Sequence, residues 1–168
     1  MDLTILIDKC LTNDRFAQRT LYESYKDSLY TIVYRLTNDV DSASDLLQEA
    51  FIDAFKNLAS LKEPLYFHAW IKQILVRKAY RYLKTKKENV SLDAVAEIGY
   101  QDSVDVEYIE KAIQALPAKS RAVFVMAEIE GFAHKEIAET LNISVGTSKS
   151  QLNYAKTKLK ALLKSHLV

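Results

Sequence analysis

The sequence is poor in residues that break secondary structure, since its 168 residues include only three glycines and two prolines. β-Sandwiches and α/β folds need many turns, so both are disfavoured and long helices with few breaks are expected. A single cysteine, Cys10, excludes an intramolecular disulfide and a CxxC zinc site. No apolar run approaches the roughly 18–20 residues of a membrane span. No basic region precedes the first apolar residues, which argues against a secretory signal, so we expect a cytoplasmic protein with no membrane insertion.

Charge is unevenly distributed along the chain, although the net charge is only +1. Residues 72–87 hold seven lysines and arginines and no acid, and residues from 140 onward hold five lysines and no acid. Between them, residues 89–118 hold six acids against one lysine, a net charge of −5. Two basic segments around an acidic one fit two contacts with one long anionic partner. The alternative is that these charges are only solvated helix faces.

Apolar periodicity predicts an all-α protein. The expected helices cover residues 16–36, 42–58, 67–84, 109–116, 117–130, 134–141 and 145–163. Ser42 and Ser144 are expected to cap their helices, Pro117 to open one and Gly131 to end it. Residues 59–66 are interpreted as a loop around Pro64, and residues 89–107 as a flexible acidic linker. The chain is therefore predicted to form two small helical domains, over residues 1–88 and 108–168.

The C-terminal segment has the pattern of a helix-turn-helix, with a short helix, a three-residue turn and a basic helix without acids. Backbone N–H groups in the first turn of the last helix, with the Thr147 hydroxyl, can hold a DNA phosphate. The side chains expected to meet base edges or backbone in the major groove are Lys149, Ser150, Gln151, Asn153 and Tyr154. The alternative is a helical hairpin that packs against a protein.

Three carboxylates, Asp45, Glu49 and Asp53, lie at i, i+4 and i+8 on one predicted helix. This spacing is compatible with a metal site, an acid–base pair, a solvated stripe, or an acidic face for a basic protein partner. A metal site would normally bring a histidine or further carboxylates at matched spacing, and the three histidines supply neither HExxH nor a Glu-x-x-His pair. We therefore expect no catalytic residue, no metal and no cofactor.

Each half of the chain carries a motif that matches a known family. The run Leu116-Pro117-x-x-x-Arg121-x-Val123-Phe124, followed by Gly131-Phe132-x-x-x-Glu136-Ile137-Ala138 and Ser144-x-Gly146-Thr147-x-Lys149-Ser150, resembles the domain with which bacterial sigma-70 factors, and most of all their extracytoplasmic-function group, bind the promoter −35 element. The run Asp45-Leu46-x-Gln48-Glu49-x-Phe51 resembles the segment that binds core polymerase, and Phe67-x-x-Trp70-Ile71 the aromatic helix after it. The resemblance covers residues 16–88 and 109–163.

The resemblance implies an RNA polymerase sigma factor that directs core polymerase to promoters and initiates transcription, and is not an enzyme. It implies a sigma2-like helical bundle followed by a sigma4-like helix-turn-helix, with an anti-sigma factor as regulator. Asp45, Gln48 and Glu49 would contact the clamp coiled coil of the largest polymerase subunit. The residues expected at the −10 element are Ser60, Lys62, Glu63, Arg77, Tyr80, Arg81 and Lys84. The residues expected at the −35 element are Thr147, Lys149, Ser150, Gln151, Asn153 and Tyr154.

Some positions depart from the family pattern. Arg77 and Arg81 stand where many members have Asn and Asp, and Ala133 stands where a serine usually caps the helix from His134. Trp70 is expected to be a core aromatic. Two other functions remain open: a repressor or activator with a dimerising N-terminal half, and a protein-interaction module without DNA binding. An enzyme ranks behind both.

Overall fold

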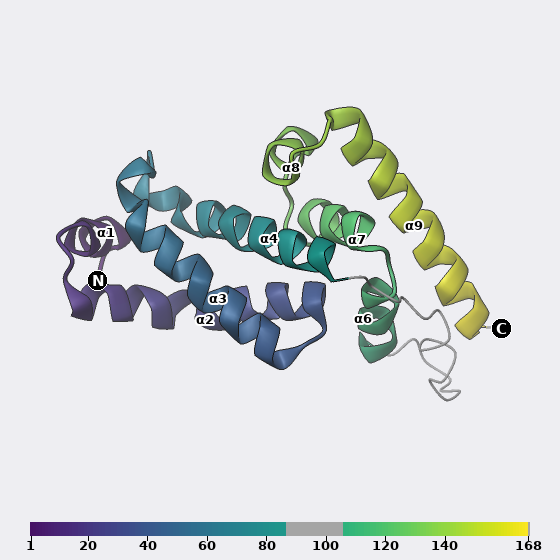
Figure 1. Cartoon of the computed structure of the whole chain (residues 1–168), viewed down its shortest axis with the longest axis horizontal. Coiled ribbons are helices and arrows are strands. Elements are labelled where there is room, and N and C mark those ends of the chain that lie inside the picture. The colour runs from purple at the N-terminus through teal and green to yellow at the C-terminus, as the bar shows by residue number, and fades with distance from the viewer. Residues whose placement is uncertain (87–105, 168) are drawn as a thin grey trace. The chain divides into compact units, whose positions relative to one another are not determined.

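The computed structural model describes residues 1–86 and 106–167, with side chains up to residue 165, and all regular secondary structure in these residues is helical (Figure 1). The predicted all-α class is therefore confirmed. The chain divides into two compact units, one of residues 1–34 and 39–79 and one of residues 35–38 and 80–168. The linker predicted over residues 89–107 lies, up to residue 105, outside the described residues. Among the described helices, none combines the length and the apolar character that a bilayer crossing requires.

The first unit is built mainly from four helices. They are α1 (Leu3–Leu11), α2 (Arg15–Thr37), α3 (Val40–Lys56) and α4 (Phe67–Thr85). The last residues of α2, from 35, and of α4, from 80, belong to the second unit. Its core contains fully buried side chains from α2 and α4, among them Leu21, Leu29, Ile71 and Leu75. The helices predicted over residues 16–36 and 67–84 are confirmed to within one residue at each end. Burial of one apolar face per helix supplies the main favourable free energy of this packing.

Helix α1 was not predicted from the sequence. Its N-terminus is capped by Asp2, whose carboxylate accepts the Thr4 N–H at 2.9 Å, and its inner face buries Leu6, Ile7 and Cys10. Nine residues give only about two and a half helical turns, too few for periodicity to stand out. An isolated helix this short is marginal in water, so packing against the bundle stabilises it.

The connections between α2, α3 and α4 differ from the prediction in two details. Asp39, not Ser42, caps α3: the Asp39 carboxylate accepts the Ser42 N–H at 3.2 Å and also the Ser42 hydroxyl. The helix therefore begins at Val40 and buries Ala43 in its first turn. The predicted loop 59–66 contains two short 3₁₀ turns, η1 (Leu58–Ser60) and η2 (Pro64–Tyr66), and both pack against α1.

The second unit holds the predicted helix-turn-helix. Its helices are α6 (Val106–Gln114), α7 (Ala118–Phe124) with a π-helical extension η3 (Val125–Ile129), α8 (His134–Leu141) and α9 (Val145–Leu167). Figure 1 shows α8 leading through a tight turn into the long α9, and α9 packs on both α7 and α8. The turn is made by Asn142, which adopts the left-handed conformation at φ 54°. Asparagine tolerates that conformation better than most residues.

The helix ends of this unit agree only in part with those predicted from the sequence. Pro117 is the N-cap of α7 rather than its first helical residue. Gly131 ends the helical stretch with φ 74°, as predicted, because glycine adopts positive φ without a Cβ clash. Helix α6 begins before the predicted residue 109, and its Tyr108 is buried and donates its hydroxyl to the Leu162 carbonyl at 2.9 Å.

Candidate protein and nucleic-acid interfaces

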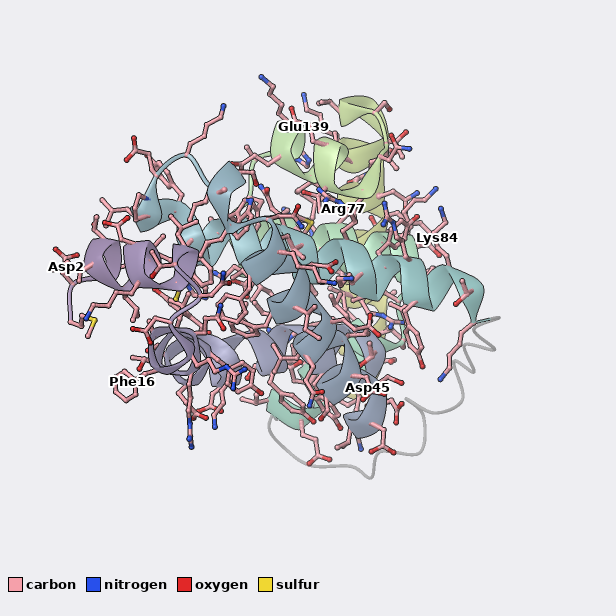
Figure 2. All side chains as sticks on the ribbon, turned by 60° about the vertical axis from the view of Figure 1, so that its left-hand side comes forward. Asp2, Phe16, Asp45, Arg77, Lys84 and Glu139 are labelled. Atoms are coloured by element: carbon pink, nitrogen blue, oxygen red, sulfur yellow. The ribbon has the colours of Figure 1, made fainter. Side chains whose placement is uncertain are left out.

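The outer face of α3 is polar and exposed. Asp45, Gln48 and Glu49 are all exposed, while Leu46 and Leu47 beside them are buried. In Figure 2 the labelled Asp45 lies in the first half of α3 with its side chain directed into solvent. Helical geometry thus separates the residues predicted to bind a partner from the residues that hold the helix to the bundle.

The third member of the carboxylate stripe has a different environment. The Asp53 carboxylate lies 2.6 Å from Nζ of Lys78 on α4, and Glu49 lies 4.0 Å from the same nitrogen. One lysine of the predicted basic segment 72–87 therefore joins α4 to α3 and offers less charge to an external anion. In residues 1–86 and 106–167, no group of three His, Cys, Asp or Glu side chains has the arrangement of a metal site.

A hollow of about 270 Å³ adjoins this acidic face between α2 and α3. Its lining residues are Tyr22, Lys26, Asp27, Tyr30, Ser44, Leu47 and Gln48. Lys26 is held by Glu23, with an Nζ–Oε2 distance of 2.6 Å. The sequence did not reveal this hollow, because its walls come from two consecutive helices, and only their packing brings residues 22–30 and 44–48 together.

The basic residues of α4 face in more than one direction. Arg81 and Lys84 are exposed and Arg77 is half-buried, and Figure 2 shows the labelled Arg77 and Lys84 projecting from this helix. Tyr80 is only 4 % exposed, and burial raises the pKa of its hydroxyl. Lys84 covers its ring, with Nζ 5.2 Å from the centroid. A buried ring is not available to stack on a base, so the predicted DNA contact of Tyr80 is not supported.

The segment between α3 and α4 exposes more than the predicted residues. Ser60, Lys62 and Glu63 are exposed, and the Ser60 hydroxyl donates to the Asn57 carbonyl at 2.7 Å. Beside them, Leu65 and Tyr66 are 77 % and 66 % exposed, which sequence reasoning missed. The sequence does carry a sign of this exposure, because Leu65 and Tyr66 do not continue the apolar period of either flanking helix.

The first turns of α9 carry the side chains predicted to meet DNA. The Ser144 Oγ accepts the Thr147 N–H at 2.9 Å, as the predicted cap requires, and its hydroxyl donates to Thr147 Oγ1 at 2.9 Å. Of the predicted residues, Lys149, Ser150, Asn153 and Tyr154 are exposed, and Thr147 and Gln151 are half-buried. Spacing places Thr147, Ser150, Gln151 and Tyr154 on one side of the helix.

Helix α8 begins without a side-chain cap, since Ala133 occupies the N-cap position. The Glu136 carboxylate partly replaces the cap by accepting the Ala133 N–H at 2.8 Å. His134, the first residue of α8, places Nδ1 2.8 Å from the Ser148 Oγ on α9. Trp70, expected in the core, is only half-buried, with its ring centroid 6.1 Å from that of Phe67.

Comparisons with known proteins match both halves of the chain. Residues 21–88 match the model for sigma-70 region 2, and residues 106–159 match the model for sigma-70 region 4. A curated relative, the ECF RNA polymerase sigma factor SigW of Bacillus subtilis, is 30 % identical over 170 residues, which cover 90 % of this chain and 91 % of that protein.

Two solved structures share the fold. One is the sigma factor RpoE of Bartonella quintana in complex with the anti-sigma factor NepR, with a TM-score of 0.66 and 23 % identity over 87 % of this chain and 96 % of that chain. The other is CnrH in complex with the cytosolic domain of CnrY, with a TM-score of 0.64 and 23 % identity over 96 % of each chain.

Proposed function

The chain belongs to the extracytoplasmic-function group of the sigma-70 family, whose members direct RNA polymerase to promoters to initiate transcription, and we propose which of its surfaces carry out each step. The observation that carries the proposal is the combination of two features on one chain. One is an exposed acidic face on α3, and the other is a helix-turn-helix whose second helix has five lysines and no acid.

The acidic face of α3 is the proposed polymerase contact. Asp45, Gln48 and Glu49 would meet the coiled coil of the largest subunit, with the carboxylates facing basic side chains. This assignment is supported by their exposure, and by the burial of the opposite face of α3, which holds them on a rigid element.

Promoter DNA would contact both units. For the −10 element the proposed residues are Ser60, Lys62, Glu63, Arg77, Arg81 and Lys84, and for the −35 element they are Thr147, Lys149, Ser150, Gln151, Asn153 and Tyr154. Exposed cations hold phosphates and set affinity, whereas amide and hydroxyl groups of α9 discriminate base edges. Opening the duplex also needs a surface for an unstacked base. Leu65 and Tyr66, exposed beside the −10 residues, extend this surface.

We also propose separate roles for the two halves of the chain and a protein that regulates it. We place a polymerase- and −10-binding domain at residues 1–88, an acidic linker at 89–107 and a −35-binding domain at 108–168. Two proteins that share this fold are bound to an anti-sigma factor or to a cytosolic protein domain, and we propose an anti-sigma regulator here also. The chain would act in the cytoplasm and supply no catalytic residue, since polymerase performs the bond chemistry.

Run-off transcription tests the proposal. Core polymerase is incubated with a genomic promoter library, with and without the chain. New start sites preceded by shared −35 and −10 elements are expected, and they would also reveal both elements. If no new starts appear while the chain alone binds duplex DNA, the protein is a repressor or activator instead. If neither signal appears, a protein-interaction module is favoured.

A charge reversal tests the polymerase contact separately. Asp45→Lys should weaken core polymerase binding about tenfold or more, because like charges then face each other across the interface. Asp8→Lys is the matched control, since Asp8 is also an exposed aspartate of a helix in the same unit, α1. Equal binding by the two variants would contradict the assignment of the α3 face.

A further inference from the structure

Ser148 occupies an unusual position on α9. It lies four, seven and eleven residues before Leu152, Ala155 and Leu159, the residues that pack this helix inward. Its side chain is 0 % exposed, whereas Lys149 and Ser150 directly after it are exposed. A hydroxyl group thus stands in an otherwise apolar stripe, where it loses its hydrogen bonds to water and needs a protein partner.

The partner of Ser148 comes from the other helix of the helix-turn-helix. The Ser148 Oγ lies 2.8 Å from Nδ1 of His134, the first residue of α8. The bond works in either histidine tautomer, because the serine hydroxyl donates to a bare nitrogen or accepts from a protonated one. It joins the first turn of α8 to the first turn of α9, across 14 residues of chain.

Apolar packing alone would fix the two helices less sharply than this bond does. Apolar burial has no directional preference of its own, whereas a hydrogen bond weakens steeply when its distance or angle changes. Rotation of α9 about its axis would move Lys149 and Ser150 together with Ser148. A base contact is lost by a displacement of about 1 Å, whereas a mobile lysine still reaches a phosphate.

We propose that the hydrogen bond between His134 and Ser148 sets the orientation of α9 and makes His134 a positioning residue for sequence discrimination at the −35 element. The inference rests on the proposed function of α9 as the −35-reading helix. His134 itself need not touch DNA. Loss of the bond should lower discrimination between sequences more than it lowers general affinity for duplex DNA.

Asparagine and glutamine variants of His134 test whether the hydrogen bond to Ser148, and not another property of the histidine, orients α9. In asparagine the amide atoms are bonded to Cγ, as Nδ1 is in histidine, and the amide can turn either its donor or its acceptor toward Ser148. In glutamine the amide lies one bond farther out, near the position of Nε2. His134→Asn should therefore keep the bond, and His134→Gln should lose it. Ser148→Ala removes the bond from the other side.

The full-length chain, loaded on core polymerase, is titrated with a duplex carrying the −35 element recovered by run-off transcription and with the same duplex scrambled. The ratio of the two affinities should fall about fivefold in His134→Gln and Ser148→Ala, the loss expected for one hydrogen bond. His134→Asn should keep the ratio of the parent chain. Helical circular dichroism on heating reports the folded fraction, and partial unfolding would lower both affinities together and leave their ratio unchanged.

His68→Gln is the matched control, because Nε2 of His68 lies 3.4 Å from the Ser28 Oγ in the other unit. It should not change the ratio. The inference is overturned if His134→Gln and Ser148→Ala discriminate as well as the parent chain, or if His134→Asn loses as much as His134→Gln. A parent chain that shows no preference for the −35 element would instead contradict the proposed function.

Discussion

At the scale of single residues, Cys10 is a buried side chain of α1 and not an accessible thiol. Burial, with a smaller effect of the Asp14 carboxylate, raises its pKa to about 11. Because the thiolate is the reactive form, we expect slow modification by a disulfide reagent at pH 8 in the folded chain and fast modification in urea. Fast modification of the folded chain would contradict this assignment of Cys10 to the core.

The same shift predicts a pH dependence of stability. An unfolded cysteine loses its proton near its ordinary pKa of about 9, while the folded one keeps its proton up to about pH 11. The unfolded state therefore binds fewer protons between these values, and Cys10 should lower the free energy of unfolding there, by at most about 3 kcal/mol. Urea unfolding compares the parent chain with Cys10→Ala. The difference between their free energies of unfolding should be constant below pH 8.5, and above pH 9 the parent should lose stability relative to the variant. A constant difference up to pH 11 would contradict this.

Two lysines of α9 should respond differently to substitution. Lys149 is exposed next to Ser148, whereas Lys156 lies with Nζ 2.6 Å from a Glu128 carboxylate oxygen. The affinity for DNA falls as salt concentration rises, and each lysine that neutralises a phosphate adds about 0.9 to the steepness of log affinity against log salt. A −35 duplex is titrated at several salt concentrations. We expect Lys149→Gln to make the salt dependence shallower by about 1 and Lys156→Gln to change it clearly less. Equal slopes for both variants would show that the ion pair does not decide which lysine meets DNA.

At the scale of the elements, the start of α8 is under-capped and can be improved. Ala133 has the extended backbone of an N-cap, φ −71° and ψ 152°, and already donates its N–H to Glu136. Ala133→Ser would add a hydroxyl that accepts an N–H of the first turn and would complete a capping box. We expect the free energy of unfolding to rise by about 0.5–1 kcal/mol, measured by urea unfolding. In a Glu136→Ala background the gain should be smaller, and an equal gain would rule out a reciprocal cap.

At the scale of the whole molecule, the two binding activities should be needed on one chain. Fragments 1–88 and 106–168 contain the two family matches, at residues 21–88 and 106–159, and we expect the first to bind core polymerase and the second to bind −35 duplex. A mixture at micromolar concentration should not restore promoter-specific transcription, because a short tether gives an effective concentration of roughly millimolar. Run-off transcription compares the mixture with the intact chain. Full activity of the mixture would mean that polymerase alone brings the two halves together.

Much of the fold could be predicted from the sequence, because long helices carry a strong apolar period. The helices around Leu29 and Leu75 were placed correctly, and so were the turn at Asn142 and the cap at Ser144. The errors lie where local signals compete: Asp39 and Ser42 are both good caps, and backbone geometry chose the earlier residue. A helix as short as α1 depends on burial of residues such as Leu6, which periodicity over so few turns does not reveal.

The candidate interfaces, like the fold, were predicted from the sequence only in part. The sequence by itself determined which residue types are available to a polymerase and to DNA, because motif spacing and charge are properties of the chain. Only the tertiary structure decided which of them face outward: Asp45 is exposed, Tyr80 is buried, and Lys78 is held by Asp53. It also joined His134 to Ser148. The physical reason is that burial and pairing depend on which helix packs against which, and those contacts join residues far apart in the chain.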